Sequence, residues 1–167
     1  MRMRELNPHG MRIATGALAL LLLTACSSGS PDAAREHANA QAREEALARA
    51  GDATVRATAI PTVLLGEAVA KQYGIVRGDD AVMLMVSVRL TAGAQEAALP
   101  ARVTATATDL LGKRQTIAMR EVRSGDFVDY VGTATVIAPD TLRFDIAVDA
   151  GAGRRATLQF NRDFFPR

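Results

Sequence analysis

The chain has 167 residues, of which 49% are hydrophobic and 23% are charged, a composition typical of a folded globular protein and not of a disordered one. Its formal net charge of +2 depends on the first 25 residues, which hold Arg2, Arg4 and Arg12 against Glu5. Removing three of the 20 basic residues and one of the 18 acidic ones leaves 17 of each. This neutral balance argues against a nucleic-acid partner, which requires a basic surface.

An apolar run, IATGALALLLLTA, occupies residues 13–25 and follows Arg12. At about 13 residues it is too short for a membrane-spanning helix, which needs about 20, and it has the length of the apolar region of a signal peptide. Cys26 follows directly in the string LTAC (23–26), which resembles a bacterial lipobox. The resemblance implies that the Cys26 sulfur receives lipid and becomes the new N-terminus. The alternative is an ordinary signal peptide followed by an incidental cysteine.

The lipobox has consequences for location and chemistry. Cys26 is followed by Ser27 and not by the Asp that typically retains such proteins at the inner membrane, so we expect an outer-membrane anchor facing the periplasm. Cys26 is also the only cysteine, so acylation leaves no thiol for a disulfide or for nucleophilic catalysis. Both Met1 and Met11 are candidate starts, because the residues from Met11 onward already form a complete signal.

The segment after the cysteine has the composition of a tether. Residues 27–31 (SSGSP) are a flexible spacer, and residues 32–50 are rich in Ala, Arg and Glu, which favour helix. Leu47 is the only large apolar side chain in residues 32–50, so such a helix has no apolar face to bury. We therefore expect a solvated helix or a flexible tether over residues 26–51; a helix that binds a partner is the alternative.

From about Asp52 the hydrophobic period changes to two. In residues 142–148 the side chains of Leu142, Phe144, Ile146 and Val148 share one face, while polar or small residues occupy the other. Residues 155–165 repeat this pattern. Strands are expected at 53–65, 81–90, 101–111, 115–122, 127–137, 142–148 and 155–165.

The turns between these segments are short. Gly112 and Gly125 are centred in turns that predict hairpins on either side of the 115–122 segment, and Gly151-Ala152-Gly153 predicts another. Only residues 67–74 look helical. The sequence therefore predicts an all-β, antiparallel, immunoglobulin-like sandwich of about seven strands over residues 52–167, with one short helix near 67–73. A small barrel is the alternative.

Five stretches of this domain carry a family resemblance: AVAKQYGI (68–75), TATDLLG (106–112), REVRSGD (120–126), LRFDI (142–146) and FNRDFF (160–165). In this order they resemble the domain of unknown function 4426 family. The resemblance implies an all-β domain of a small exported protein of Gram-negative bacteria, with no established activity. Two positions depart from the family pattern: Met85 stands where a polar Asn is expected, and Arg77-Gly78-Asp79 replaces a more basic turn.

Glu121, Asp126 and Asp129 are the candidate site residues of the domain. They place three carboxylates on and around one turn, which is the donor type that hard cations and acid–base catalysis use. The alternative is a solvated acidic turn that pairs with Arg120 and Arg123. We expect no cofactor.

Two weaker sets of residues remain. Met83, Met85 and Met119 offer thioethers that suit copper, although flexible core packing is the more common role of methionine. Tyr73 and Tyr130 either line a pocket or pack at the rim of the sandwich.

The domain contains no histidine, since the two histidines are His9 and His37, and this excludes a Ser-His-Asp triad within it. We expect a non-catalytic binding or envelope-assembly module that is attached to the membrane through lipid on Cys26 and grips an envelope protein partner. A hydrolase or cation-dependent enzyme that uses the carboxylates around 121–129 is the alternative.

Overall fold

The computed structural model describes residues 45–92 and 95–166. The expected signal peptide (1–25), Cys26 and the first part of the tether therefore lie outside the described residues. Within the described part, no helix is long and apolar enough to cross a membrane. The elements in chain order are β1 (Ala46–Ala50), β2 (Ala53–Pro61), η1 (Thr62–Leu64), α2 (Glu67–Gln72), β3 (Ala81–Ala92), β4 (Gln95–Ala98), β5 (Arg102–Thr108), β6 (Arg114–Ile117), β7 (Arg120–Ser124), β8 (Phe127–Thr135), β9 (Asp140–Asp149) and β10 (Arg155–Phe164).

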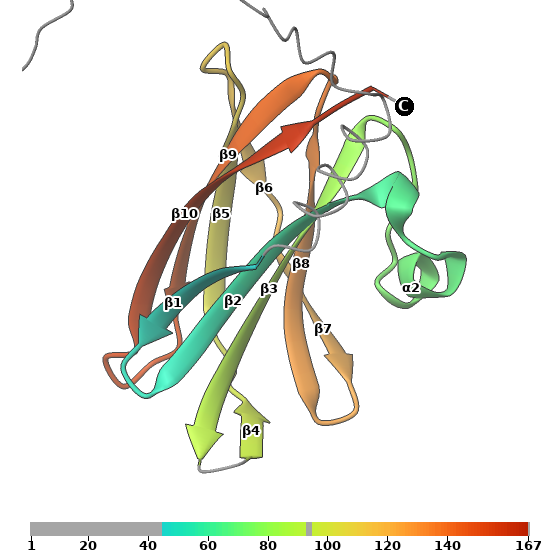
Figure 1. Ribbon diagram of the computed structural model, residues 1–167. Helices are drawn as coiled ribbons and strands as arrows, with labels where there is room; N and C mark the ends of the chain where they lie inside the picture. The colour runs from blue at the N-terminus through green and yellow to red at the C-terminus, as the bar shows by residue number, and fades with distance from the viewer. Residues whose placement is uncertain (1–44, 93–94, 167) are drawn as a thin grey trace, which may run out of the picture.

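The strands form two antiparallel sheets that pack face to face (Figure 1). A six-stranded sheet has the order β1-β2-β3-β8-β7, with β4 paired to β3, and a four-stranded sheet has the order β10-β9-β5-β6. This confirms the predicted all-β antiparallel sandwich. The short helix expected near 67–73 is also confirmed, as α2.

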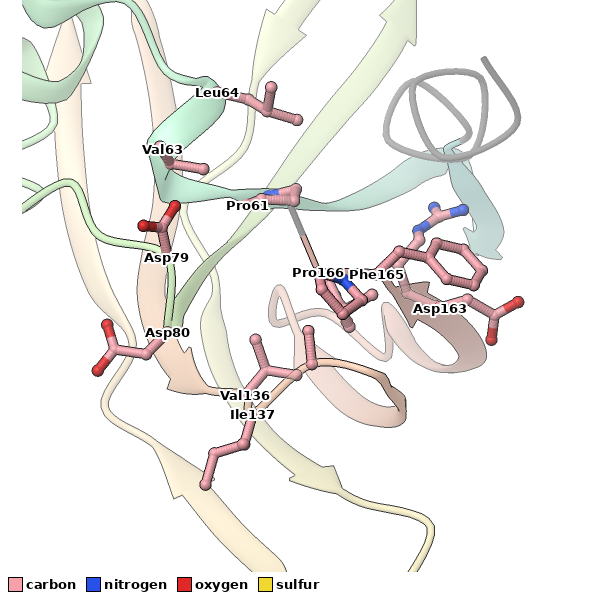
Figure 2. Close-up of a pocket in the computed structure, with 13 residues that line it drawn as sticks. Pro61, Val63, Leu64, Asp79, Asp80, Val136, Ile137, Asp163, Phe165 and Pro166 are labelled. Carbon is pink, nitrogen blue, oxygen red and sulfur yellow. The ribbon is translucent and has the colours of Figure 1, made fainter. Parts of the chain in front are cut away.

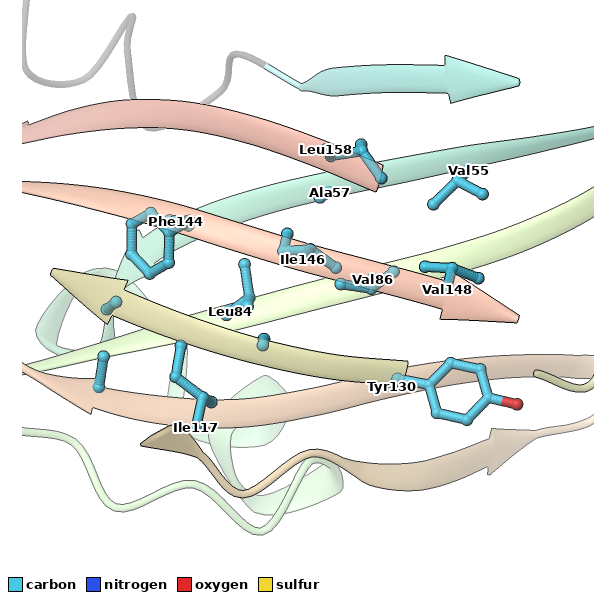
Figure 3. Close-up of a cluster of buried hydrophobic side chains, with 14 of the residues drawn as sticks. Val55, Ala57, Leu84, Val86, Ile117, Tyr130, Phe144, Ile146, Val148 and Leu158 are labelled. Atoms are coloured by element: carbon cyan, nitrogen blue, oxygen red, sulfur yellow. The ribbon is translucent and has the colours of Figure 1, made fainter. Parts of the chain in front are cut away.

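The main core lies between the sheets and follows the predicted alternation (Figure 3). In β9, the side chains of Leu142, Phe144, Ile146 and Val148 are all buried, and those of the residues between them are exposed or half-buried. The ring of Phe144 stacks on that of Phe160 in β10, with 5.1 Å between centroids. Each of the four buried side chains of β9 contributes about 1.5–3 kcal/mol through burial, before chain entropy is counted.

A second, smaller cluster covers the outer face of the six-stranded sheet. It contains Leu65, Ala70, Met83 and Val131, with α2 and its flanking loops packed over the sheet. Strand β3 is therefore buried on both faces near its start, which explains why its sequence is apolar at nearly every position.

The prediction of a helical or flexible tether over residues 26–51 is wrong for residues 46–50, which form strand β1. β1 pairs with β2, and Ala46, Ala48 and Ala50 face the core while Leu47 and Arg49 point to solvent. Alanine favours helix in isolation, but pairing with an open sheet edge overrides that preference. The sandwich therefore begins before residue 52.

The predicted strand 115–122 is divided between the two sheets. β6 pairs with β5 in the four-stranded sheet, and after Ala118 and Met119 the chain continues as β7, which pairs with β8 in the other. The crossover passes closely over Gly132: a Cβ at this glycine would lie 2.5 Å from Cγ2 of Ile117 and 2.8 Å from the carbonyl oxygen of Ala118. This division, together with β1 and β4, accounts for the strands beyond the seven expected.

Candidate functional site

The three predicted carboxylates do not converge. In the β7–β8 hairpin, Glu121 is paired in register with Tyr130 and Val122 with Asp129. Neighbouring residues of a strand point to opposite faces of a sheet, so Glu121 and Asp129 lie on opposite faces of the six-stranded sheet. Asp126 lies in the exposed turn between the strands. Among the described residues, no three His, Cys, Asp or Glu side chains are grouped closely enough to hold a metal ion.

Two of these carboxylates are engaged by arginines. Oδ1 of Asp129 lies 2.6 Å from Nη2 of Arg89, whose guanidinium also donates to the carbonyl oxygen of Val128 at 2.7 Å. Oε1 of Glu121 lies 2.7 Å from Nη2 of Arg123. The structure therefore favours paired structural carboxylates at this hairpin over an assembled acid–base or cation site.

The two tyrosines each contact one of these carboxylates. The Tyr73 hydroxyl donates to Asp129 at 3.4 Å, and the Tyr130 hydroxyl donates to Glu121 at 3.5 Å while accepting from the backbone N–H of Ala101 at 2.6 Å. Burial raises the pKa of both hydroxyls, and the neighbouring carboxylate raises it further in each case. Tyr130 is thus a buried member of the main core, whereas Tyr73 packs against the outer cluster, and both serve as neutral hydrogen-bonding groups.

The methionines do not share one site. Met83 is fully buried in the outer cluster beneath α2, and Met85 lies half-buried at its border. Met119 packs against the main core instead, in the crossover between β6 and β7. Core packing thus accounts for the positions of these side chains.

A cavity of about 360 Å³ opens at one end of the sandwich (Figure 2). It lies where β2 and β10 end, between the loop before β3 and the loop after β8. Its lining is mostly apolar and contains Pro61, Val63, Leu64, Val136, Ile137, Ala138, Phe164, Phe165 and Pro166, with the charged residues Asp79, Asp80, Arg162 and Asp163.

The loops around this cavity are held in place by local contacts. β2 ends at Pro61, which has no N–H to continue the ladder. The next residue, Thr62, is buried, and its hydroxyl donates to the carbonyl oxygen of Gly78 and accepts from the N–H of Gly78, both at 3.0 Å. The N–H of Val136 donates to the carbonyl oxygen of Asp80 at 2.9 Å. The cavity is thus formed by ordered backbone.

Large apolar side chains at the cavity are exposed to solvent. Ile137 is 82% exposed and Phe165 is 49% exposed, and Leu64 lies at the opposite wall. Exposed apolar groups gathered around a concavity are a feature of binding surfaces.

The rim of the cavity carries unpaired negative charge. Asp79 and Asp80 are exposed, and neither they nor Asp163 has an ion-pair partner in the part of the chain that the structure describes. Asp163 accepts a hydrogen bond from the Thr141 hydroxyl at 2.7 Å. Arg162 is buried, with its guanidinium 5.5 Å from the centre of the Phe160 ring. The opening is therefore apolar with an acidic border.

Reasoning from the sequence missed this cavity. The predicted strands 53–65, 127–137 and 155–165 included Val63, Leu64, Ile137 and Phe165 as ordinary strand residues. The structure ends each strand earlier, at Pro61, Thr135 and Phe164. The sequence did contain one signal for this cavity: large apolar residues lie close to Pro61, Pro139 and Pro166, where the strands end.

Comparisons with known proteins agree with this fold. A crystal structure of a DUF4426 family protein from Pseudomonas aeruginosa PAO1 is similar at 27% identity with a TM-score of 0.62, covering 74% of this chain and 96% of that one. FetP of uropathogenic Escherichia coli is similar at 9% identity with a TM-score of 0.52, covering 73% and 95%. A copper-bound FetP variant is similar at 12% identity with a TM-score of 0.51, covering 74% and 95%. At such identities the likeness to FetP shows a shared fold alone.

No protein with a curated description matches the chain. The family model named domain of unknown function DUF4426 matches residues 47–167, from β1 to the last residue of the sequence. This match covers most of the chain, and it includes the five stretches that carry the resemblance. The chain therefore belongs to the DUF4426 family.

Proposed function

We propose that this protein is a periplasmic lipoprotein, anchored to the outer membrane through lipid on Cys26, whose sandwich is a non-catalytic binding module for an envelope protein. The apolar cavity with its acidic border is the observation that carries this proposal. An apolar side chain of a partner would fill the cavity, and its neighbours would meet the exposed Leu64, Ile137 and Phe165. Protein interfaces commonly place such an anchor residue in a desolvated pocket.

The arrangement of acids supports a binding role over catalysis. A hydrolase that uses two carboxylates needs both to flank one scissile bond of the substrate, and Glu121 and Asp129 lie on opposite faces of a sheet. The domain also has no histidine and no cysteine in its sequence. The carboxylates around 121–129 therefore do not form the group of catalytic residues that the enzyme alternative requires.

Copper is a second alternative, because the similar FetP variant is described as copper-bound. The methionines of this chain do not assemble a copper site. Met83 is buried among Leu65, Ala70 and Val131, and Met119 lies in a different cluster. The domain sequence supplies no imidazole or thiolate to join these thioethers. We therefore assign no copper-dependent step to this protein.

Site-specific photocrosslinking in living cells tests the proposal. A photoreactive phenylalanine analogue at Ile137 should form crosslinks to an envelope protein, and Val63→Arg should remove them by placing a charge in the cavity. The same analogue at Leu47, an exposed apolar position on β1, is the matched control. Equal crosslinking from both positions, or none from Ile137, would contradict a binding role for the cavity.

A further inference from the structure

The turn between β5 and β6 carries two adjacent exposed leucines. Leu110 is 73% exposed and Leu111 is 95% exposed. The turn itself is well ordered: the N–H of Gly112 donates to the carbonyl oxygen of Asp109 at 3.0 Å, and the N–H of Lys113 donates to the Asp109 carboxylate at 2.8 Å. These leucines, which we call the hairpin tip (Leu110 and Leu111), are thus held outward by a fixed backbone.

The turn between β5 and β6, which carries the hairpin tip, lies at the same end of the sandwich as the ends of β2 and β10 (Figure 1), and residues at those two strand ends line the cavity. The N–H of Leu110 donates to Oδ1 of Asp140 at 3.3 Å, and Asp140 is paired with the cavity residue Phe164. Leu111 nevertheless remains almost fully exposed, so the tip does not occupy the cavity of its own chain.

The hairpin tip and the cavity have complementary chemistry. The tip is apolar, and after Gly112 it is followed by Lys113 and Arg114. Lys113 is exposed and has no ion-pair partner among the described residues, while Arg114 is 62% exposed with a long 3.9 Å contact to Asp145. The cavity is apolar and is bordered by Asp79, Asp80 and Asp163. An apolar pair followed in the chain by two cations is the chemistry that this opening would select.

We propose that the cavity binds the hairpin tip of a second copy of this chain, in a reciprocal two-fold dimer. This rests on the proposed function, because it names the partner of the same cavity. Since tip and cavity share one end of the molecule, two copies that meet end to end insert each tip into the other's cavity, and the contact closes after two copies. Lys113 of each copy then faces the acidic border of the other.

The lipid anchor allows a small contact to hold two copies together. One tip and one cavity on each side form a small interface, and small interfaces are weak in dilute solution. Copies that are anchored to the same membrane meet at a high effective concentration, which favours dimer formation although no further residues come into contact. We therefore expect the dimer in the membrane.

Carbodiimide crosslinking of the full-length protein in membranes tests this arrangement, because the reagent joins a lysine amine to a carboxylate only when the two are in contact. Two differently tagged copies are expressed together, and the doubly tagged product is isolated and its joined peptides are identified. We expect a bond between Lys113 of one copy and Asp79 or Asp80 of the other. Leu111→Ser should lower the yield about tenfold, since burying a leucine contributes at least the ~1.4 kcal/mol that a tenfold change in affinity requires. Leu47→Ser, the same change at another exposed position, should leave the yield unchanged.

A charge exchange tests the same contact without the reagent. Lys113→Glu in both copies should reduce co-purification of the two tags. Adding Asp79→Lys and Asp80→Lys to both copies should restore it, because both contacts of the dimer then have exchanged charges. Crosslinks found only within single copies, or equal losses from Leu111→Ser and Leu47→Ser, would overturn the dimer. If the analogue at Ile137 captures a different protein and never a second copy, the dimer is wrong and the proposed function stands. If it captures no protein, both are wrong.

Discussion

Arg89 and Asp129 form an ion pair on the outer face of the six-stranded sheet, with 2.6 Å between Nη2 and Oδ1 and with side chains only 9% and 13% exposed. The guanidinium of Arg89 also lies 5.3 Å from the centre of the Phe127 ring. A pair so shielded from water differs from the surface pairs of this protein, because loss of one partner leaves the other charge buried without compensation.

The first prediction concerns this pair. Asp129→Ala should lower the free energy of unfolding by about 3 kcal/mol, because Arg89 remains buried without its counter-charge. Glu96→Ala breaks the pair between Arg56 and Glu96, whose side chains are 39% and 40% exposed, and should cost less than about 1 kcal/mol. Urea denaturation of both variants measures the difference. Equal losses would show that the Asp129 pair is as solvated as a surface pair.

The second prediction concerns the crossover between the sheets. Gly132→Ala should destabilise the fold by about 1–3 kcal/mol, because the new methyl group would meet Ile117 and the rigid backbone at Ala118. Gly66→Ala is the control, since a Cβ there meets nothing within 4 Å, and its effect should stay within about 0.5 kcal/mol. Thermal unfolding measures both variants. A stable Gly132→Ala protein would mean that the crossover does not pass close to β8.

The third prediction concerns the start of the domain. A chain shortened to residues 45–167 should unfold cooperatively and be more stable than one shortened to residues 52–167. The shorter chain lacks β1, which removes the fully buried Ala50 and exposes the edge of β2. Denaturation midpoints of the two chains decide the matter, and equal midpoints would place residues 46–50 outside the folded unit.

The fourth prediction concerns alkaline pH. The folded-state pKa of Tyr73 and that of Tyr130 are both raised above the ordinary value of 10.0, chiefly by burial. The stability that these neutral hydroxyls support is therefore fully present below pH 10 and is lost as the pH rises through the raised values. Tyr73→Phe should flatten part of this decline, measured as unfolding free energy against pH. An unchanged slope would indicate that Tyr73 is solvated.

The fifth prediction concerns the anchor. Cys26→Ala should abolish incorporation of labelled palmitate and release the protein from the membrane fraction, because the acyl chains are the expected attachment. The matched control is Ser27→Ala, which leaves the acceptor sulfur in place. If the Cys26→Ala protein stays in the membrane fraction and the unaltered protein takes up no palmitate, then Cys26 is not the lipid attachment site.

The sequence by itself determined the local features of this protein. The inward and outward faces of residues 142–148 follow from the two-residue period of a strand, which depends only on neighbouring residues. The hairpin turns at Gly112, Gly125 and Gly151 are equally local, and each has positive φ in the structure. The family could also be recognised from the sequence, because each of the five stretches that carry the resemblance is a continuous run of residues.

The tertiary structure decided which distant groups meet. Residues 46–50 have the composition of a helix, and only the open edge of β2 makes them a strand. Glu121 and Asp129 are close in sequence, yet a one-residue difference in hairpin register places them on opposite faces of a sheet. The cavity joins loops near residues 63, 80, 137 and 165, and no local pattern indicates that contact because it exists only after both sheets have formed and packed.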